Sequence, residues 1–95
     1  MSIVVTLQYY NILRRAAGFE EEQISLTSGS SIRDALDQLP TRSNAALRDL
    51  LFNGDGEIVS HLVVFRNRKL VTQDGFDTEL ADGDELKLFP AVSGG

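Results

Sequence analysis

Four stretches of the chain have the residue pattern of β-strands. In Ile3–Tyr9, apolar side chains recur at every second position from the first residue, which places them on one face of a strand. Glu22–Leu26 alternates in the same way, and we expect it to pair antiparallel with the first stretch through a wide loop. His61–Arg66 and Glu85–Phe89 are rich in strand-forming residues and predict two further strands.

A helical period replaces the alternation after Leu26. Apolar residues recur there at positions i, i+3, i+4 and i+7, which predicts a helix with one buried face. Ser30 or Ser31 can cap its first turn, and we expect Pro40 to end it. The residues predicted to face the core are Ile32, Ala35, Leu36 and Leu39.

Two shorter segments also have helical character. Asn44 can cap a short helix in which three leucines share a face, and Asn11–Ala17 can form a helical turn that Gly18 closes in a left-handed conformation. Tight turns are expected at Asn53–Gly56, after Asn67 and at Asp82–Asp84, with a short edge strand at Lys69–Val71. The three leucines are Leu47, Leu50 and Leu51.

This order of elements predicts the α+β class. A hairpin, one main helix and further strands give a mixed sheet of four to five strands, with the main helix packed on one face and a short second helix. We expect a single domain over residues 1–89 and a flexible tail, Pro90–Gly95, that reads PAVSGG.

The composition of the chain limits the kinds of partner and site that we expect. The 95 residues carry a formal net charge of −5 and include no cysteine and one histidine, His61. The acidic balance argues against nucleic acid and anionic membranes as partners. Without cysteine or a second histidine, we expect no metal site, and we interpret His61 as a surface residue. The acidic turns Asp55, Asp82 and Asp84 lack the spacing of a calcium loop, so we expect them to be solvated. No apolar run is long enough to span a membrane, and a soluble cytoplasmic protein is the expectation.

The last fourteen residues, DGDELKLFPAVSGG from Asp82 to Gly95, resemble the end of the ubiquitin-like sulfur carriers of the MoaD and ThiS family. The helix start Ser31–Leu36 and the strand end Val64–Asn67 are also similar, so the resemblance covers the whole chain. It implies the β-grasp fold. Many members have two prolines where this chain has Pro90–Ala91, and several have Asn-Gly where it has Asn67–Arg68.

The resemblance also implies a function. In these carriers an E1-like enzyme of the MoeB or ThiF type uses ATP and magnesium to adenylate the terminal carboxylate, here Gly95, and sulfur then converts it to a thiocarboxylate. The carrier itself would be neither an enzyme nor a cofactor-binding protein. Gly94 and Gly95 lack a Cβ and can thread a narrow channel. The other tail residues expected to contact partners are Pro90, Ala91, Val92 and Ser93.

A docking face for the partner is expected next to the tail. If Leu62, Val64, Leu86 and Leu88 face the helix, then Val63, Phe65 and Phe89 form an apolar patch on the open side of the sheet. The alternatives are that the two faces are reversed or that loops cover this one.

The sequence leaves three uses of Gly95 open. The thiocarboxylate could donate sulfur to a metabolite or a tRNA, the chain could be the small subunit of molybdopterin synthase beside its large subunit, or Gly95 could be joined to lysines of target proteins. All three begin from the same adenylate.

Overall fold

The computed structural model describes residues 1–18, 20–42, 45–59 and 62–90 of the chain. Five strands form one sheet in the order β2-β1-β5-β3-β4. β1 and β5 run parallel, and the other neighbouring pairs are antiparallel, which confirms the mixed sheet. The strands are β1 (Ser2–Tyr9), β2 (Glu21–Thr27), β3 (Val63–Arg66), β4 (Lys69–Val71) and β5 (Glu85–Phe89).

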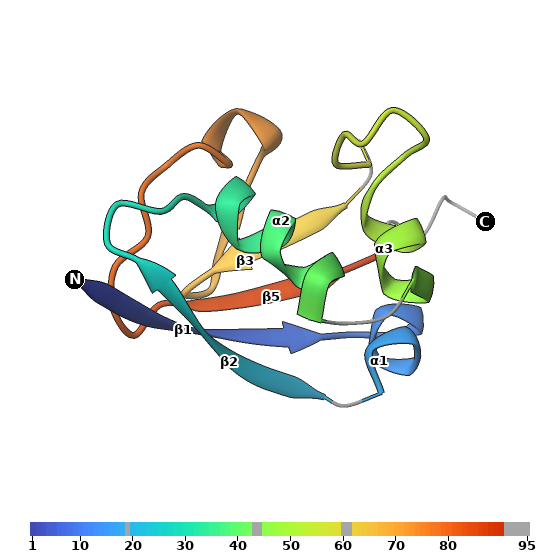
Figure 1. The fold of residues 1–95 in the computed structure, drawn as a ribbon, viewed down its shortest axis with the longest axis horizontal. Helices are drawn as coiled ribbons and strands as arrows, with labels where there is room; N and C mark the ends of the chain where they lie inside the picture. Colours follow the sequence, from blue (N-terminus) through green and yellow to red (C-terminus); the bar gives the residue numbers. More distant parts are fainter. Residues whose placement is uncertain (19, 43–44, 60–61, 91–95) are drawn as a thin grey trace.

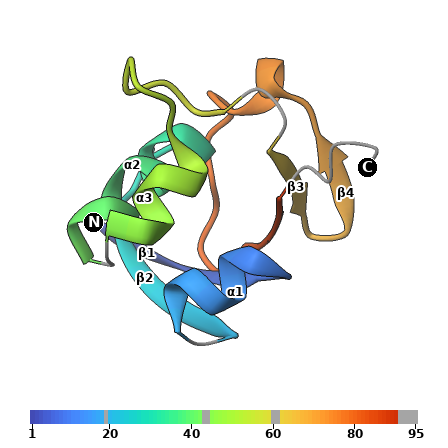
Figure 2. The same ribbon diagram turned by 90° about the vertical axis from the view of Figure 1, so that its right-hand side faces the viewer.

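Helices cover one side of this sheet. The main helix, α2 (Ile32–Arg42), crosses in front of the strands, α3 (Ala45–Leu51) packs beside it, and α1 (Ile12–Ala17) joins β1 to β2 (Figure 1). Turning the molecule shows α2 and α3 together on one side, with the β3–β4 hairpin away from them (Figure 2). A single 3-10 turn, η1 (Gln73–Gly75), follows β4.

Local signals explain where two of the helices begin or end. The Ser31 hydroxyl accepts from the Asp34 N–H at 3.2 Å, and the Asp34 carboxylate accepts from the Ser31 N–H at 2.9 Å, which is a capping box. Gly18 closes α1 with a φ of 88°, as expected. Asn44, the expected cap of α3, lies outside the described residues.

The prediction that Pro40 ends the main helix is wrong, because α2 continues to Arg42. A proline removes one N–H donor and crowds the carbonyl four residues before it, but residues after it can still donate to their own partners. Close to the end of a helix this cost is limited to a single turn, so the proline is tolerated there.

The core lies between the sheet and the helices. The apolar faces predicted for the strands are the buried ones. The leucines of α3 complete the core on the helix side, where Leu47 and Leu51 are buried and Leu50 is partly buried. The expected orientation of Leu39 lies outside the described side chains. Fully buried residues include Val5, Leu7, Tyr9, Leu13, Ile32, Leu36, Leu47, Leu51, Val64, Phe76, Leu86 and Leu88.

Candidate docking surface

The side of the sheet opposite the helices carries the predicted patch. Along β3 and β5, Val64, Leu86 and Leu88 are buried in the core, whereas Val63, Phe65 and Phe89 are only partly buried. Val63 pairs with Phe89 across the two strands, so these side chains are neighbours on the open face. The assignment of faces made from the sequence therefore agrees with the structure.

Phe89 lies at the centre of a group of aromatic rings. Its ring stacks on Tyr10 with centroids 4.2 Å apart and an interplanar angle of 13°. The Phe65 ring meets it edge-on at 5.6 Å, and the Arg14 guanidinium carbon lies 5.5 Å from the centroid of Tyr10. These contacts join the three rings into one continuous surface, since both stacked and edge-on geometries are favourable.

Leu70 on β4 extends this surface. It pairs directly with Phe65, so both side chains point to the open face. Leu70 is 60% exposed, which is unusual for a large apolar side chain. We call Tyr10, Val63, Phe65, Leu70 and Phe89 together the apolar platform. Tyr10 and Leu70 were missed in the sequence, because neither belongs to the strands from which the patch was inferred.

The other half of the open face is polar. Following the register from Phe65 across β5 and β1 leads to Lys87, Gln8 and Glu21 in turn. The Gln8 amide donates to the Glu21 carboxylate at 3.2 Å, so this half is occupied by its own hydrogen bonds. An apolar surface bordered by polar residues is the arrangement found at protein–protein interfaces.

Asp84 lies in the turn before β5. The sequence predicted that it is solvated, but this prediction is wrong, because the structure buries it. It is 6% exposed. Its Oδ2 accepts from the Arg66 guanidinium at 2.7 Å and from the Ala81 N–H at 2.8 Å, and its Oδ1 accepts from the Asn67 amide at 2.8 Å. Burial raises the pKa of the Asp84 carboxyl, but the hydrogen bonds from Ala81, Asn67 and Arg66 outweigh burial and hold that pKa below 3.8, its ordinary value.

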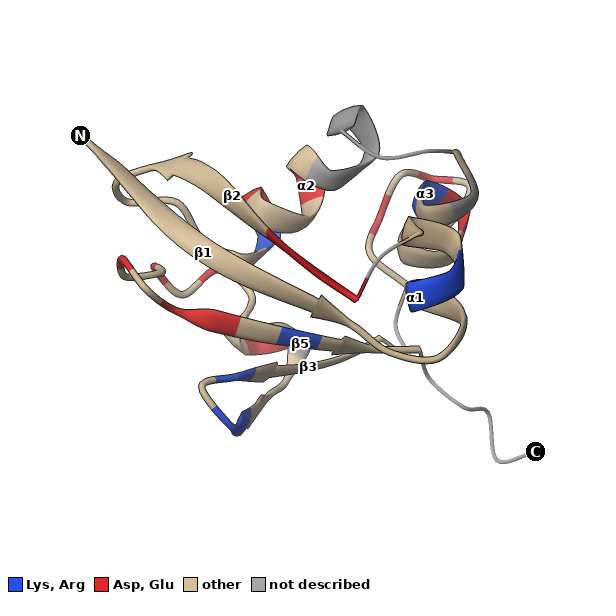
Figure 3. Ribbon diagram, turned by 90° about the horizontal axis from the view of Figure 1, so that it is seen from below, with Lys and Arg blue, Asp and Glu red and all other residues tan. Residues whose placement is uncertain are grey.

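Basic residues cluster at the hairpin that joins β3 to β4, close to this acidic turn (Figure 3). Arg66 is bound to Asp84, whereas Arg68 and Lys69 are exposed. In a chain of net charge −5, this is a local region of the opposite sign at the border of the platform. Such a region can orient an approaching acidic partner.

The tail begins where the platform ends. Phe89 is the last residue of β5, and Pro90, partly buried, is the last residue that the structure describes. The other predicted site residues, Ala91, Val92, Ser93, Gly94 and Gly95, lie outside the described residues, as does His61. The platform therefore includes the residue that directly precedes the tail, while the roles of the tail residues stay predictions.

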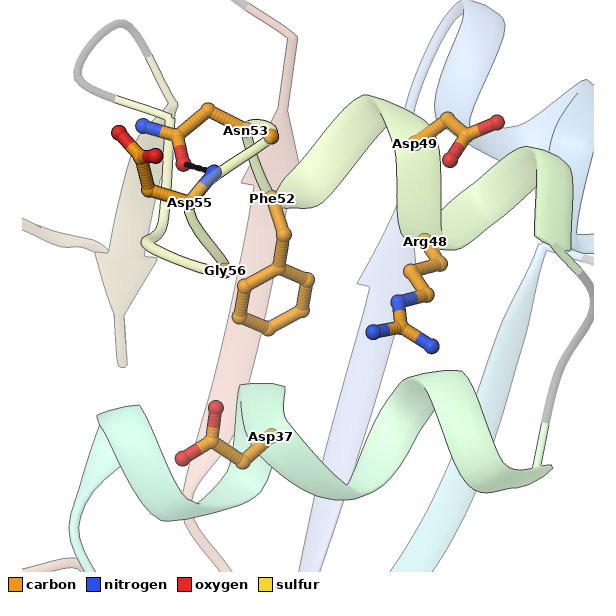
Figure 4. Close-up of a pocket in the computed structure, with 8 residues that line it drawn as sticks. Asp37, Arg48, Asp49, Phe52, Asn53, Asp55 and Gly56 are labelled. Atoms are coloured by element: carbon orange, nitrogen blue, oxygen red, sulfur yellow. Dashed lines mark hydrogen bonds between the residues drawn. The ribbon is translucent and has the colours of Figure 1, made fainter.

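A hollow of about 460 Å³ lies on the opposite side of the molecule, between α2 and the end of α3. Asp37 points into it from α2 and Arg48 from α3, and Phe52 lies between them and the Asn53–Gly56 turn, whereas the Asp49 side chain points away from α2 (Figure 4). In that turn the Asn53 side chain accepts from the Asp55 N–H at 2.8 Å. Within the described ranges, no three His, Asp or Glu side chains converge as metal ligands would, and no helix is long and apolar enough to cross a membrane.

The mixed sheet clasping one main helix, with a platform at the root of a diglycine tail, defines a ubiquitin-like β-grasp protein. Comparison with solved structures agrees: small archaeal modifier protein 1 from Haloferax volcanii superposes with a TM-score of 0.85 at 33% identity, over 97% of this chain and 99% of that one. The ThiS family model matches residues 7–95. The chain belongs to the ThiS family.

Three known proteins show how this chain relates to that family. Small archaeal modifier protein 1 of Haloferax volcanii is 36% identical over 83 residues, which is 87% of this chain and 91% of the relative. Small archaeal modifier protein 3 of the same organism is 30% identical over 90 residues, 94% and 96% of the two chains. The structure of a putative molybdopterin converting factor, subunit 1, from Pyrococcus furiosus has a TM-score of 0.74 at 28% identity, over 95% of this chain and 99% of that one.

Proposed function

We propose that this protein is a sulfur carrier whose working group is the carboxylate of Gly95. An adenylating enzyme docks on the apolar platform and receives the tail in its active site. The carboxylate attacks the α-phosphate of ATP and releases pyrophosphate. Hydrosulfide then attacks the acyl carbon, the bond to AMP breaks, AMP leaves, and a thiocarboxylate remains on Gly95.

The platform is the observation that carries this proposal. Phe89 belongs to the packed rings and directly precedes Pro90, the first residue of the tail, so a partner bound to the rings is already beside Pro90. Fixing the root of the tail limits the volume that Gly95 can explore, which raises its effective concentration at the partner's active site. The match to the family model also extends to residue 95.

The tail residues suit this use by their chemistry. Gly94 and Gly95 present no side chain to a narrow channel, and the acyl carbon of Gly95 is unhindered. Val92 supplies one apolar contact, and Pro90 ends the ladder of the sheet because it lacks an N–H donor. ATP and magnesium belong to the adenylating enzyme, and the carrier brings no catalytic side chain of its own.

The molybdopterin pathway is the first acceptor to test. The Pyrococcus furiosus relative is described as a putative molybdopterin converting factor, and it is 28% identical over 95% of this chain. In that case the chain would act as the small subunit of molybdopterin synthase, with the tail inserted into a larger subunit. Another sulfur-accepting enzyme of the cytoplasm would use the same thiocarboxylate.

A second candidate is a protein modifier. Both curated relatives described above are named small archaeal modifier proteins, at 36% and 30% identity. The adenylate of Gly95 would then be attacked by a lysine amine of a target protein, with loss of AMP and formation of an isopeptide bond. The two candidates differ only in the nucleophile that follows activation.

The intact mass of the protein purified from its own cells separates these candidates. A mass gain equal to replacement of one oxygen by sulfur at Gly95 supports the carrier, whereas adducts in which Gly95 is joined to lysine support the modifier. If cells grown with a demand for sulfur show neither the mass gain nor the lysine adducts, both candidate functions are contradicted.

A truncated chain lacking Gly94 and Gly95 is the control for activation. It should unfold at nearly the same temperature as the full chain, and it should give no ATP–pyrophosphate exchange with the adenylating enzyme. A large loss of thermal stability would show instead that the two glycines have a structural role.

A further inference from the structure

The turn of the β3–β4 hairpin has a backbone conformation that its residues do not favour. Asn67 has a φ of 49° and Arg68 a φ of 74°. Two left-handed residues in a two-residue loop match the twist of a hairpin, but this conformation suits Asn-Gly. For Arg68, whose Cβ crowds the backbone there, the cost is about 1–2 kcal/mol. Contacts elsewhere must offset it.

Asn67 supplies such contacts by binding the start of β5. Its side-chain amide donates to the Asp84 carboxylate at 2.8 Å, and its side-chain oxygen accepts from the Glu85 N–H at 2.9 Å. Its backbone N–H donates to the Glu85 carbonyl at 2.9 Å. We call the hydrogen bonds of Asn67 with Asp84 and with Glu85 the Asn67–Asp84 clamp.

Asp84 is itself held in place. Besides Asn67, it binds the Arg66 guanidinium at 2.7 Å and the Ala81 N–H at 2.8 Å, and its backbone carbonyl accepts from the Thr6 N–H at 2.9 Å. The carboxylate thus joins the hairpin to the turn before β5, and the backbone carbonyl of the same residue joins that turn to β1. A buried anion with this many donors is rigid, because moving it leaves several polar groups without partners.

The clamp matters because, apart from the partly buried Val71 and the pairing with β3, little positions β4. β4 has 3 residues, lies at the edge of the sheet and neighbours β3 alone. The direction in which it leaves the turn therefore decides whether Leu70 lies beside Phe65. Leu70 is 60% exposed, so core packing does not fix it either.

We infer that Asn67 and Asp84 are positioning residues for docking: by holding the left-handed turn, the clamp aligns Leu70 with the rest of the apolar platform before a partner arrives. The docking part of this inference rests on the proposed function. Preorganisation of this kind favours binding, since the partner does not have to order the hairpin itself.

The neighbouring Asp82 provides a matched control. Its carboxylate also accepts a backbone N–H, that of Val4, at 2.8 Å, and Gly83 donates to the Val4 carbonyl at 2.8 Å. Asp82 therefore ties the same turn to β1, on the polar half of the sheet. Loss of either carboxylate removes hydrogen bonds from this turn, but only loss of Asp84 releases the hairpin.

Hydrogen exchange tests the clamp without any partner. In Asp84→Asn and Asn67→Ala, the amides that pair β3 with β4 should exchange about tenfold faster, while those between β1 and β2 change less than about twofold. Asp82→Asn should leave the hairpin amides protected. Unchanged protection in both clamp variants would overturn the inference, and so would an equal increase over the whole sheet.

Kinetics of activation test the docking role. With the organism's own MoeB- or ThiF-type enzyme, ATP and labelled pyrophosphate, the clamp variants should raise KM for the carrier about tenfold and change kcat less than about twofold. Asp82→Asn should do neither. A normal KM with a loosened hairpin, or an equal rise in the control, would contradict the docking role.

Rescue distinguishes positioning from general damage. Adding Arg68→Gly to Asn67→Ala removes the least favourable side chain from the turn and should restore most of the amide protection and of the KM. Failure of this rescue on both measurements would overturn the inference. If the unaltered protein supports no ATP–pyrophosphate exchange, the proposed function is contradicted, and the docking role is contradicted with it. Hydrogen exchange still decides whether the clamp holds the turn.

Discussion

The sheet contains two hairpins of opposite design. β1 and β2 have 8 and 7 residues, pair over most of their length and are joined through α1, whereas β3 and β4 have 4 and 3 residues and are joined by a two-residue turn. The first carries its apolar residues on the core face and, apart from the exposed Val4, polar residues on the open face. The second presents Phe65 and Leu70 to the open face.

Because of this difference, the first hairpin mainly stabilises the fold, and the second mainly provides the surface that a partner would bind. Long strands with a fully buried face supply most of the hydrophobic free energy, because that free energy scales with apolar area removed from water. The short hairpin buries little and is free to expose apolar side chains, but it then depends on the Asn67–Asp84 clamp for its shape. Changes in the first hairpin should therefore alter folding, and changes in the second should alter binding.

The largest expected effect is on folding, in β1. Leu7→Ala removes a fully buried side chain from the centre of the sheet and should lower the free energy of unfolding by roughly 2–5 kcal/mol. Val71→Ala, at a partly buried position of β4, should cost about 1 kcal/mol. Urea denaturation of both variants measures the difference. Equal costs would mean that the two hairpins contribute alike to the core.

The next effect is on docking. Leu70→Asp places a charge on the platform and should weaken binding of the adenylating enzyme about 30-fold, roughly 2 kcal/mol, with little change in thermal unfolding. Val4→Asp is the matched control, because Val4 is an apolar residue of the same face, 40% exposed, in the other hairpin. Calorimetric titration of both variants checks this. Equal losses would show that the whole face binds, and not the platform alone.

Phe89→Asp tests the centre of the platform in the same way. It should weaken docking at least as much as Leu70→Asp, because it also breaks the stack with Tyr10. The variant should remain folded, as Phe89 points away from the core, and circular dichroism would verify this. Unfolding would mean that the rings also support the sheet.

A smaller effect is expected from pH. The pKa of Asp84 is lower in the folded chain than in the unfolded one, because hydrogen bonds to the carboxylate outweigh its burial. Fewer protons are bound in the folded state, so this contribution is present above about pH 4 and is lost as the pH falls through the folded pKa. Asp84→Asn should flatten the fall of Tm as the pH is lowered below about 5. An unchanged profile would show that other carboxylates control acid unfolding.

The smallest effect is a gain in stability. Arg68→Gly removes a Cβ from a residue with a φ of 74° and should stabilise the chain by roughly 0.5–1 kcal/mol, since glycine adopts this conformation readily. Thermal unfolding measures it, with Arg15→Gly on α1 as the contrasting change that should destabilise. A loss of stability in Arg68→Gly would mean that the Arg68 side chain makes a compensating contact.

The sequence predicted what depends on local period and local capping. The alternation of β1, a cap at Ser31, and the alternation within β3 and within β5 that sets the faces of Phe65 and Phe89 all follow from residues close together in the chain. These features are confirmed because burial on one side of a sheet admits one register only.

What the sequence missed depends on distant partners. From its own neighbours in the sequence, Asp84 is a solvated turn residue. It is buried because the fold brings Arg66 and Asn67 of the β3–β4 hairpin to its carboxylate. Leu70 looks like an ordinary edge residue until its pairing with Phe65 places it on the platform. The prediction that Pro40 ends α2 is wrong for a different reason: the rule that proline breaks a helix holds for helix interiors, and Pro40 lies near a helix end.

The parallel pairing of β1 with β5 has a consequence for biosynthesis. The strand that completes the middle of the sheet, β5, lies at residues 85–89 and is made after the four strands that it joins into one sheet. Until it leaves the ribosome, β1 has no neighbour on one side and β3 has none on its inner side, and such non-local pairing forms late in folding. A nascent chain that stops early thus lacks both its central strand and the ring of Phe89, and offers an activating enzyme no folded surface to recognise.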